Sequence, residues 1–167
     1  MAETIQLEVV TPDGTKLSTQ VDELTAPSVD GEFGVLPGHR PMLAALKTGI
    51  VRFAIGPEQK EVAVGPGFVQ VSDDRAILLT DRFIEKAQVD PVRARLELKE
   101  TDEALDRFDG DPESAELARL ILRAAWAAAQ LELYGDPPPP TIRSFEHEFR
   151  LVSEESYRPE EGHGHGN

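Results

Sequence analysis

A change in the spacing of glycine and of apolar residues near residue 90 divides this chain of 167 residues into two kinds of structure. Eight of the 13 glycines precede residue 90, only Gly110 lies within residues 90–134, and four follow. Glycine is favoured at turns and disfavoured inside helices. We therefore expect a unit of short strands followed by helices.

The first unit has the period of two that strands with one buried face require. Ile5, Leu7 and Val9 alternate with polar residues, and residues 11–14 have the composition of a turn. Further short β-rich runs lie at residues 17–21, 50–55, 62–64, 68–71 and 76–79. Many short strands with close turns predict an antiparallel β-sandwich or barrel-like unit, which we place at residues 1–89.

The second unit, residues 90–134, has a helical period. Asp90 followed by Pro91 is typical of an N-cap with proline in the first turn. The residues that recur at three- and four-residue steps are Ala94, Leu98, Leu105 and Phe108, with Thr101 at the intermediate step. Gly110 is predicted to end this helix.

A second helix is predicted to begin at residues 111–113, where Asp111 and Pro112 repeat the cap pattern. Its apolar stripe consists of Leu117, Ile121, Ala124, Ala128 and Leu131. Because the connection is short, the two helices are expected to form an antiparallel hairpin. A hairpin of this size buries little surface by itself, so we expect it to pack on the β unit or on a partner.

Residues 135–167 form a proline-rich, acidic tail that we predict to be disordered. Four consecutive prolines at residues 137–140 are typical of a stiff, extended spacer. Apolar residues within 145–152 allow a short docking segment. His163 and His165 fit either a loosely held divalent metal or an unstructured terminus, and the terminus is favoured because two flexible imidazoles fix no coordination geometry.

The net charge of -14 and the pI near 4.6 exclude some classes of partner. Binding to nucleic acid or to an anionic membrane surface requires a basic face, so neither is expected. The absence of cysteine excludes disulfides, thiolate metal sites and a cysteine nucleophile. No apolar run approaches the roughly 20 residues of a membrane-spanning helix, and the N-terminus lacks a signal pattern, so we expect a soluble, cytoplasmic chain.

Few residues indicate catalysis. Asp30 and Glu32 lie near His39 in the sequence and fit acid–base chemistry, but a solvated loop is the favoured explanation. No nucleophile with an adjacent base is evident. The glycines within residues 65–67 lack the Lys and Ser or Thr that a phosphate-binding loop requires.

Residues 30–41 combine three glycines with two prolines and so impose a specific backbone path. This composition fits a tight hairpin with a bulge in a small β-sandwich. It equally fits a rigid, exposed loop that presents Glu32, His39 and Arg40 to a partner. The residue pattern alone leaves both interpretations open.

Several segments of the chain match one known family in order and spacing. The most specific is residues 26–49, which contains Gly-Glu-Phe-Gly at 31–34 and Pro-Gly-His at 37–39. The other matching segments are residues 7–12, 64–71, 89–94 and 114–119. Through these segments the chain resembles the epsilon subunit of F-type ATP synthase over about residues 3–134, and the tail lies outside the family pattern.

The resemblance implies an N-terminal β-sandwich, a C-terminal helical hairpin and a non-catalytic role in the rotor. The sandwich would bind the gamma subunit and rest on the c ring, so that ion flow is coupled to ATP synthesis. The residues of the c-ring-facing loop would be Glu32, Gly34, Pro37, Gly38 and His39. The chain would be a peripheral membrane protein on the cytoplasmic side of a bacterial inner membrane, without direct lipid contact.

The resemblance also implies that the hairpin, residues 90–134, is mobile. It would fold against the sandwich or extend along gamma into the alpha/beta catalytic head, where it blocks ATP hydrolysis. Some relatives bind ATP through a motif that Asp90, Arg93 and Ala94 match here, so ATP is a candidate weak regulatory ligand. Asp90 is equally explained as an N-cap and Arg93 as an ordinary surface residue. No other cofactor is implied.

Two other classes of function fit the residue pattern. One is a stand-alone regulatory or ligand-binding β-sandwich protein with a helical appendage. The other is a small enzyme, which the absence of a nucleophile–base pair disfavours. Stable association with a gamma-type coiled-coil subunit would separate the rotor subunit from both.

Overall fold

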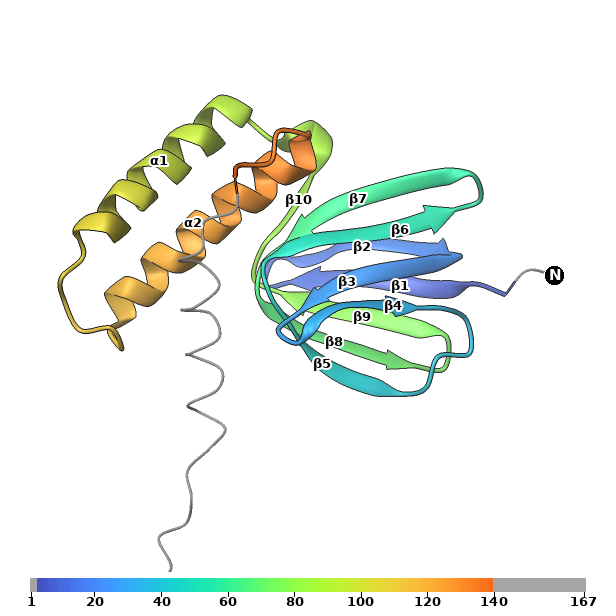
Figure 1. The fold of residues 1–167 in the computed structure, drawn as a ribbon. Helices are drawn as coiled ribbons and strands as arrows, with labels where there is room; N and C mark the ends of the chain where they lie inside the picture. The colour runs from blue at the N-terminus through green and yellow to red at the C-terminus, as the bar shows by residue number, and fades with distance from the viewer. Residues whose placement is uncertain (1–2, 140–167) are drawn as a thin grey trace, which may run out of the picture.

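The computed structural model describes residues 3–139 and shows a β-sandwich followed by a helical hairpin (Figure 1). The predicted docking segment within residues 145–152 and the two terminal histidines lie outside the described residues, as does the predicted disorder beyond residue 139. The strands are β1 (Ile5–Thr11), β2 (Gly14–Val21), β3 (Glu23–Ser28), β4 (Gly31–Val35), β5 (Met42–Leu46), β6 (Gly49–Ile55), β7 (Glu58–Val64), β8 (Gly67–Ser72), β9 (Arg75–Thr80) and β10 (Phe83–Glu85).

The strands follow one continuous hydrogen-bonded path, β10-β7-β6-β3-β5-β8-β9-β1-β2, and β4 pairs with β3 beside this path. Among the described strands, β1 and β9 pair in parallel and the other pairs are antiparallel. The path folds back on itself, so that β6 and β7 face β8 and β9 across the core (Figure 1). This confirms the predicted antiparallel sandwich and adds one parallel pair.

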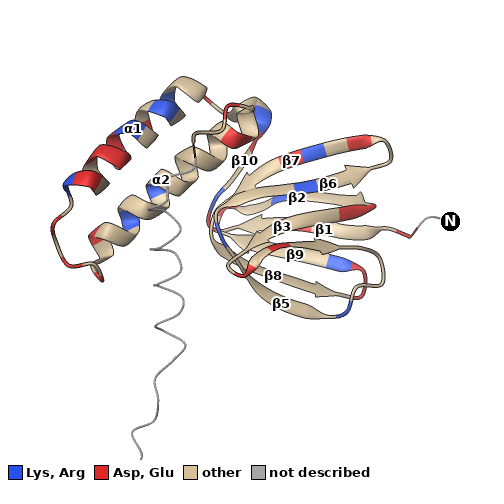
Figure 2. Ribbon diagram, in the orientation of Figure 1, with Lys and Arg blue, Asp and Glu red and all other residues tan. Residues whose placement is uncertain are grey.

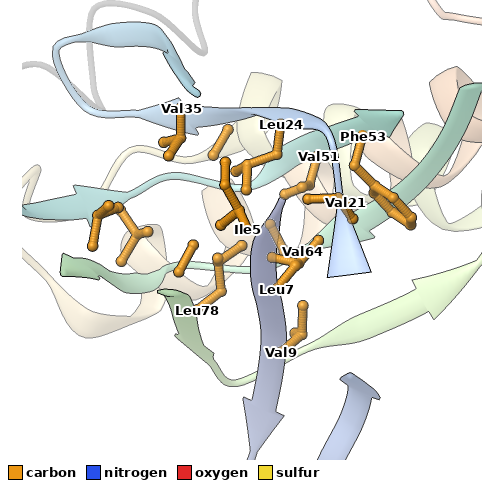
Figure 3. Packing of buried hydrophobic residues seen from close by; sticks show 14 of the residues in the cluster. Ile5, Leu7, Val9, Val21, Leu24, Val35, Val51, Phe53, Val64 and Leu78 are labelled. Atoms are coloured by element: carbon orange, nitrogen blue, oxygen red, sulfur yellow. The ribbon is translucent and has the colours of Figure 1, made fainter. Parts of the chain in front are cut away.

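The core lies between the two layers and is built from every second residue of the strands (Figure 3). Ile5, Leu7 and Val9 are fully buried while their neighbours in β1 are half-exposed, which confirms the period of two. Val51 and Val64 reach the same cluster from the other layer. Burial of this apolar surface is the main force that stabilises the sandwich.

Residues 23–46 contain three strands, so the glycine- and proline-rich segment at residues 30–41 comprises part of a hairpin and the loop that follows it. Its first half is a hairpin: the Ser28 hydroxyl donates to the carbonyl of Gly31 at 2.6 Å and accepts from the amide of Asp30 at 3.1 Å. Gly31 has a φ of 115°, which a residue with a side chain rarely adopts. Only residues 36–41 form a loop, between β4 and β5.

A 3₁₀ turn (Lys86–Gln88) leads from the sheet to α1 (Pro91–Arg107) and α2 (Ala115–Tyr134). The predicted cap of α1 is confirmed, since the Asp90 carboxylate accepts a hydrogen bond from the amide of Arg93 at 3.1 Å. The predicted end at Gly110 is wrong. The helix ends at Arg107 because Phe108 has extended backbone, and Gly110 instead leaves room for the Phe108 ring beside it.

The predicted start of the second helix at residues 111–113 is also wrong. The N-cap is Ser114, whose hydroxyl accepts from the amide of Leu117 at 3.3 Å. Asp111 uses its carboxylate for a preceding turn, where it accepts from the amide of Glu113 at 2.9 Å. Both residues are cap formers, and the helix begins after the second of them.

The second helix is buried on two faces. Leu117, Ile121 and Ala124 belong to the predicted stripe and are buried, and α1 packs along α2 as an antiparallel hairpin (Figure 1). Ala129 and Leu133 form a second buried face that contacts the sheet. The hairpin therefore packs on the sandwich through α2, as the small size of its own core led us to expect.

Candidate functional site

The five residues of the expected c-ring-facing loop lie along one strand and its following loop. Glu32 and Gly34 are in β4, opposite Pro27 and Thr25 of β3, so their expected position in a loop is corrected. The hairpin turn at residues 28–31 starts the strand before Glu32 is reached, which is the physical reason. Pro37, Gly38 and His39 follow in the loop before β5.

The loop after β4 is fixed by contacts with a distant turn. The amide of Gly38 donates to the Asp74 carboxylate at 2.6 Å, and the amide of His39 donates to the carbonyl of Leu36 at 3.1 Å. Asp74 lies in the turn between β8 and β9, at the end of the sandwich away from the helices (Figure 1). A loop held in this way presents its side chains in one arrangement, which suits a docking surface.

Glu32 and His39 are not brought together. Glu32 lies near the start of β4 and forms an ion pair with Arg52 at 3.3 Å, whereas His39 follows the other end of the strand. The Nδ1 atom of His39 is 2.7 Å from the carbonyl of Arg40. Asp30 lies in the turn that precedes β4, so the acid–base arrangement with His39 is not formed.

A face of exposed apolar side chains covers the layer formed by β5, β8 and β9. Leu43, Phe68 and Leu79 are 71%, 56% and 51% exposed. Phe68 is paired in register with Leu79 and with Ala45, which lies two residues from Leu43 on β5. The three side chains therefore share one outer face.

Most of this layer carries no charged residue and is tan in Figure 2. Neither helix lies over the layer in Figure 1. The sequence contains a signal that we did not use: residues 68–69 and 77–79 are apolar at consecutive positions. Such runs place apolar side chains on both faces of a strand. Either both faces are then covered, or one apolar face is exposed to solvent.

The hairpin contacts the opposite side of the sandwich. Ala129 and Leu133 of α2 pack with Ile50, Ala63 and Val89 in a second apolar cluster. A further contact to this cluster comes from Trp126, over whose ring the guanidinium of Arg82 lies at 5.8 Å from the centroid.

Arg52 was not predicted as a functional residue from the sequence. It connects the β4 strand, which contains Glu32, with the hairpin. Its guanidinium is 3.3 Å from Glu32, 3.0 Å from Glu61 and 3.3 Å from Glu132 of α2. A single arginine in a strand of mixed composition carries no local signal, because its three partners come from three other elements.

The residues of the candidate ATP motif lie at the start of α1, where Asp90 is the N-cap and Arg93 is in the first turn. The Asp90 carboxylate is engaged as the helix cap and the Arg93 side chain is exposed. On α2, the Arg123 Nε atom lies 2.8 Å from Glu97, and this hydrogen bond and charge raise the pKa of Arg123. That ion pair joins the two helices of the hairpin.

Two features are absent from residues 3–139. No group of three or more His, Cys, Asp or Glu side chains within this part is placed to hold a metal ion. No helix within the same residues is long and apolar enough to cross a membrane.

The chain thus combines a sandwich that has one apolar outer face with a loop anchored at one end and a packed helical hairpin. Residues 4–86 match the family model for the ATP synthase Delta/Epsilon chain, beta-sandwich domain. The chain is 42% identical over 132 residues to the ATP synthase epsilon chain of Magnetococcus marinus, covering 78% of this chain and 94% of the relative.

Other relatives agree. The epsilon chain of Syntrophobacter fumaroxidans is 38% identical over 127 residues, covering 74% of this chain and 95% of the relative. The chain therefore belongs to the ATP synthase epsilon chain family. A chain of the Euglena gracilis mitochondrial ATP synthase shares the fold at 22% identity, with a TM-score of 0.65 over 77% of this chain and 79% of that one.

Proposed function

We propose that this protein is a non-catalytic subunit of the central stalk of an F-type ATP synthase, where it couples ion translocation to ATP synthesis. The observation that carries the proposal is the exposed apolar face of Leu43, Phe68 and Leu79 on a sandwich whose opposite side holds the hairpin. Membership of the epsilon chain family supports it. In this role the chain joins a complex and has no substrate of its own.

The apolar face is proposed as the surface that binds the gamma subunit. Large apolar side chains in register, more than half exposed, are typical of the centre of a protein interface. The aromatic ring of Phe68 is the expected anchor, because aromatic residues are enriched at interfaces and a few central residues contribute most of the binding energy.

Phe68→Glu tests this surface. We expect the dissociation constant for the gamma subunit to rise about 30-fold or more, since loss of an anchor residue costs about 2 kcal/mol or more. The thermal midpoint should change little because the side chain is exposed. Lys16→Glu, on the polar strand β2, is the matched control and should leave binding unchanged. Unchanged affinity in Phe68→Glu would contradict the proposal.

The edge formed by β4 and its loop is proposed to face the c ring. In the sheet, β4 pairs with β3 beside the main path of strands. This edge contains Glu32, Gly34, Pro37, Gly38 and His39. An acidic side chain such as Glu32 suits basic groups on the ring, since such pairs fix orientation more than they add affinity. The loop anchored on Asp74 suits a rigid contact.

The hairpin is proposed to regulate ATP hydrolysis by leaving the sandwich and extending along gamma toward the alpha/beta head. Support comes from the contact itself, in which a few apolar side chains of α2, among them Ala129 and Leu133, hold the hairpin on the sheet. An interface of this size allows two populated arrangements.

ATP is proposed as a weak regulatory ligand at Asp90 and Arg93, since both lie in one helical turn and the Arg93 side chain is exposed. The proposed location is the cytoplasmic side of a bacterial inner membrane, reached through the complex. The net charge of -14 argues against direct contact with anionic lipid.

A further inference from the structure

One arginine on the sheet holds carboxylates from three other elements. The Nε atom of Arg52, in β6, lies 3.0 Å from Oε1 of Glu61 in β7. The Nη1 atom lies 3.3 Å from Oε2 of Glu32 in β4, and the Nη2 atom lies 3.3 Å from Oε1 of Glu132 in α2. Each nitrogen of the guanidinium therefore has its own carboxylate.

This cluster borders the apolar contact that holds the hairpin. Arg52 lies two residues from Ile50, and its register partner Glu61 lies two residues from Ala63. Side chains two apart in a strand share a face, so the charged row continues the apolar row. Glu132 and Leu133 are adjacent in α2, and they reach the charged and the apolar row respectively.

The charges in the cluster do not balance. Three carboxylates share one guanidinium, so they compete for it, and they repel one another when it is absent. An isolated surface ion pair contributes little to stability. A shared cation differs, because neutralising one carboxylate leaves the guanidinium more available to the other two.

We propose that Arg52 couples Glu32 to the docking of the hairpin. When a cationic side chain of a partner neutralises Glu32, Arg52 interacts more strongly with Glu132 and holds α2 on the sandwich. The coupling is reciprocal: the partner's cation binds Glu32 better when the hairpin is docked. Identifying that partner with the c ring rests on the proposed function, whereas the coupling is a property of this chain alone.

Trp126 provides the signal with which to measure docking. It is the single tryptophan of the chain and it packs in the contact between hairpin and sheet. The experiment follows Trp126 fluorescence of the full chain during urea unfolding at low salt. Urea is uncharged and leaves ion pairs unscreened, and circular dichroism reports the sheet in parallel.

The proposal requires opposite shifts from two variants of the same cluster. Arg52→Met keeps much of the apolar stem, removes the charge, and should lower the urea midpoint of the Trp126 signal. Glu32→Gln should raise it, with an expected change of about fivefold or less in the docking equilibrium constant. In the double variant the rise caused by Glu32→Gln should be smaller, since without the shared cation only the repulsion between the carboxylates is relieved.

The control breaks an ion pair of similar geometry that does not reach the hairpin. Arg75 lies 2.8 Å from Glu8 within the sandwich, and Arg75→Met should leave the docking of Trp126 unchanged. The expected differences among the Arg52 and Glu32 variants should shrink in 0.5 M salt, where exposed charges are screened within about 5 Å.

A lowered or unchanged midpoint in Glu32→Gln would overturn the proposal, because a purely structural ion pair gives that result. All measurements use the chain without partners. If the unmodified protein does not bind the gamma subunit, the proposed function is refuted and the coupling still stands. Equal midpoints in Glu32→Gln and wild type would refute the coupling alone.

Discussion

At Gly67 the chain passes so close to its neighbouring strand that no side chain fits. A Cβ atom placed there would lie 1.8 Å from the carbonyl oxygen of Leu79, which belongs to the backbone and cannot turn away. Gly34 differs, since a Cβ there would meet its nearest atoms, from Leu24 and Thr25, at 3.9 and 4.0 Å. Of these two glycines within matching family segments, only Gly67 is required to be glycine by the surrounding backbone.

Gly67→Ala is expected to destabilise the sandwich by about 1–3 kcal/mol, because β8 and β9 must separate to admit the methyl group. Gly34→Ala should change stability by no more than about 0.5 kcal/mol, since the contacts are ordinary and the φ is negative. Urea midpoints of the two variants by circular dichroism measure the difference. Equal midpoints in the two variants would contradict this expectation, because β9 would then move away from the added methyl group without a measurable loss of stability.

Individual residues also show where sequence reasoning stops. The burial of Ile5, Leu7 and Val9 could be predicted, because a strand with one covered face must alternate. The role of Arg52 could not, since it depends on carboxylates from three elements that only the folded chain brings together. The placement of Glu32 in a strand depended on the Ser28 turn, whose hydrogen bonds leave no periodic pattern.

The start of α1 is set by one side chain with two proposed roles. The Asp90 carboxylate caps the helix through the amide of Arg93, and removing such a cap costs about 1 kcal/mol. Asp90→Ala is therefore expected to lower helix stability by about that amount, whereas Asp90→Ser should keep it within a few tenths of a kcal/mol.

Calorimetric titration with ATP on these Asp90 variants separates the two roles. Nucleotide binding through the carboxylate would be weakened in Asp90→Ser although the helix stays stable. Binding equal to that of the wild type, or millimolar or absent binding in the wild type itself, would leave Asp90 as a cap alone.

The boundaries of the helices were harder to predict than their existence. Their apolar period was strong enough to place both, but Asp111 and Ser114 are both cap formers and only hydrogen bonding decides between them. Likewise, glycine is a residue type that often follows a helix end, yet Gly110 leaves room for the Phe108 ring. Caps compete locally, and a single sequence does not reveal which one wins.

The relation of the hairpin to the sandwich is a property of the whole chain. The stripe of Leu117, Ile121 and Ala124 predicted one apolar helix face, but the second face begins at Ala129, within a run of small residues, and continues to Leu133. Small side chains can pack against many kinds of surface. The apolar period of the helix alone therefore could not show that this face packs on the sheet. The apolar face of β5, β8 and β9 was missed for a different reason, since its signal lies in the consecutive apolar residues at 68–69 and 77–79 and not in a period.

The two sides of the sandwich give the molecule its proposed mode of action. One side offers Leu43, Phe68 and Leu79 to a stalk partner, while the other holds a hairpin through a limited apolar contact bordered by Arg52. A permanent attachment and a reversible one can therefore coexist on one small fold. Regulation would then follow from release of the hairpin while the sandwich stays in place.

The rate of ATP hydrolysis by the assembled synthase tests this division of roles. The complex is assembled with the full chain and, in parallel, with a chain that lacks residues 90–134, and incorporation of both is verified by stoichiometry. We expect the shortened chain to be incorporated equally, because the sandwich carries the attachment, and hydrolysis to be faster, because the inhibitory hairpin is gone. Equal rates in the two complexes would contradict the account, as would failure of the full chain to assemble.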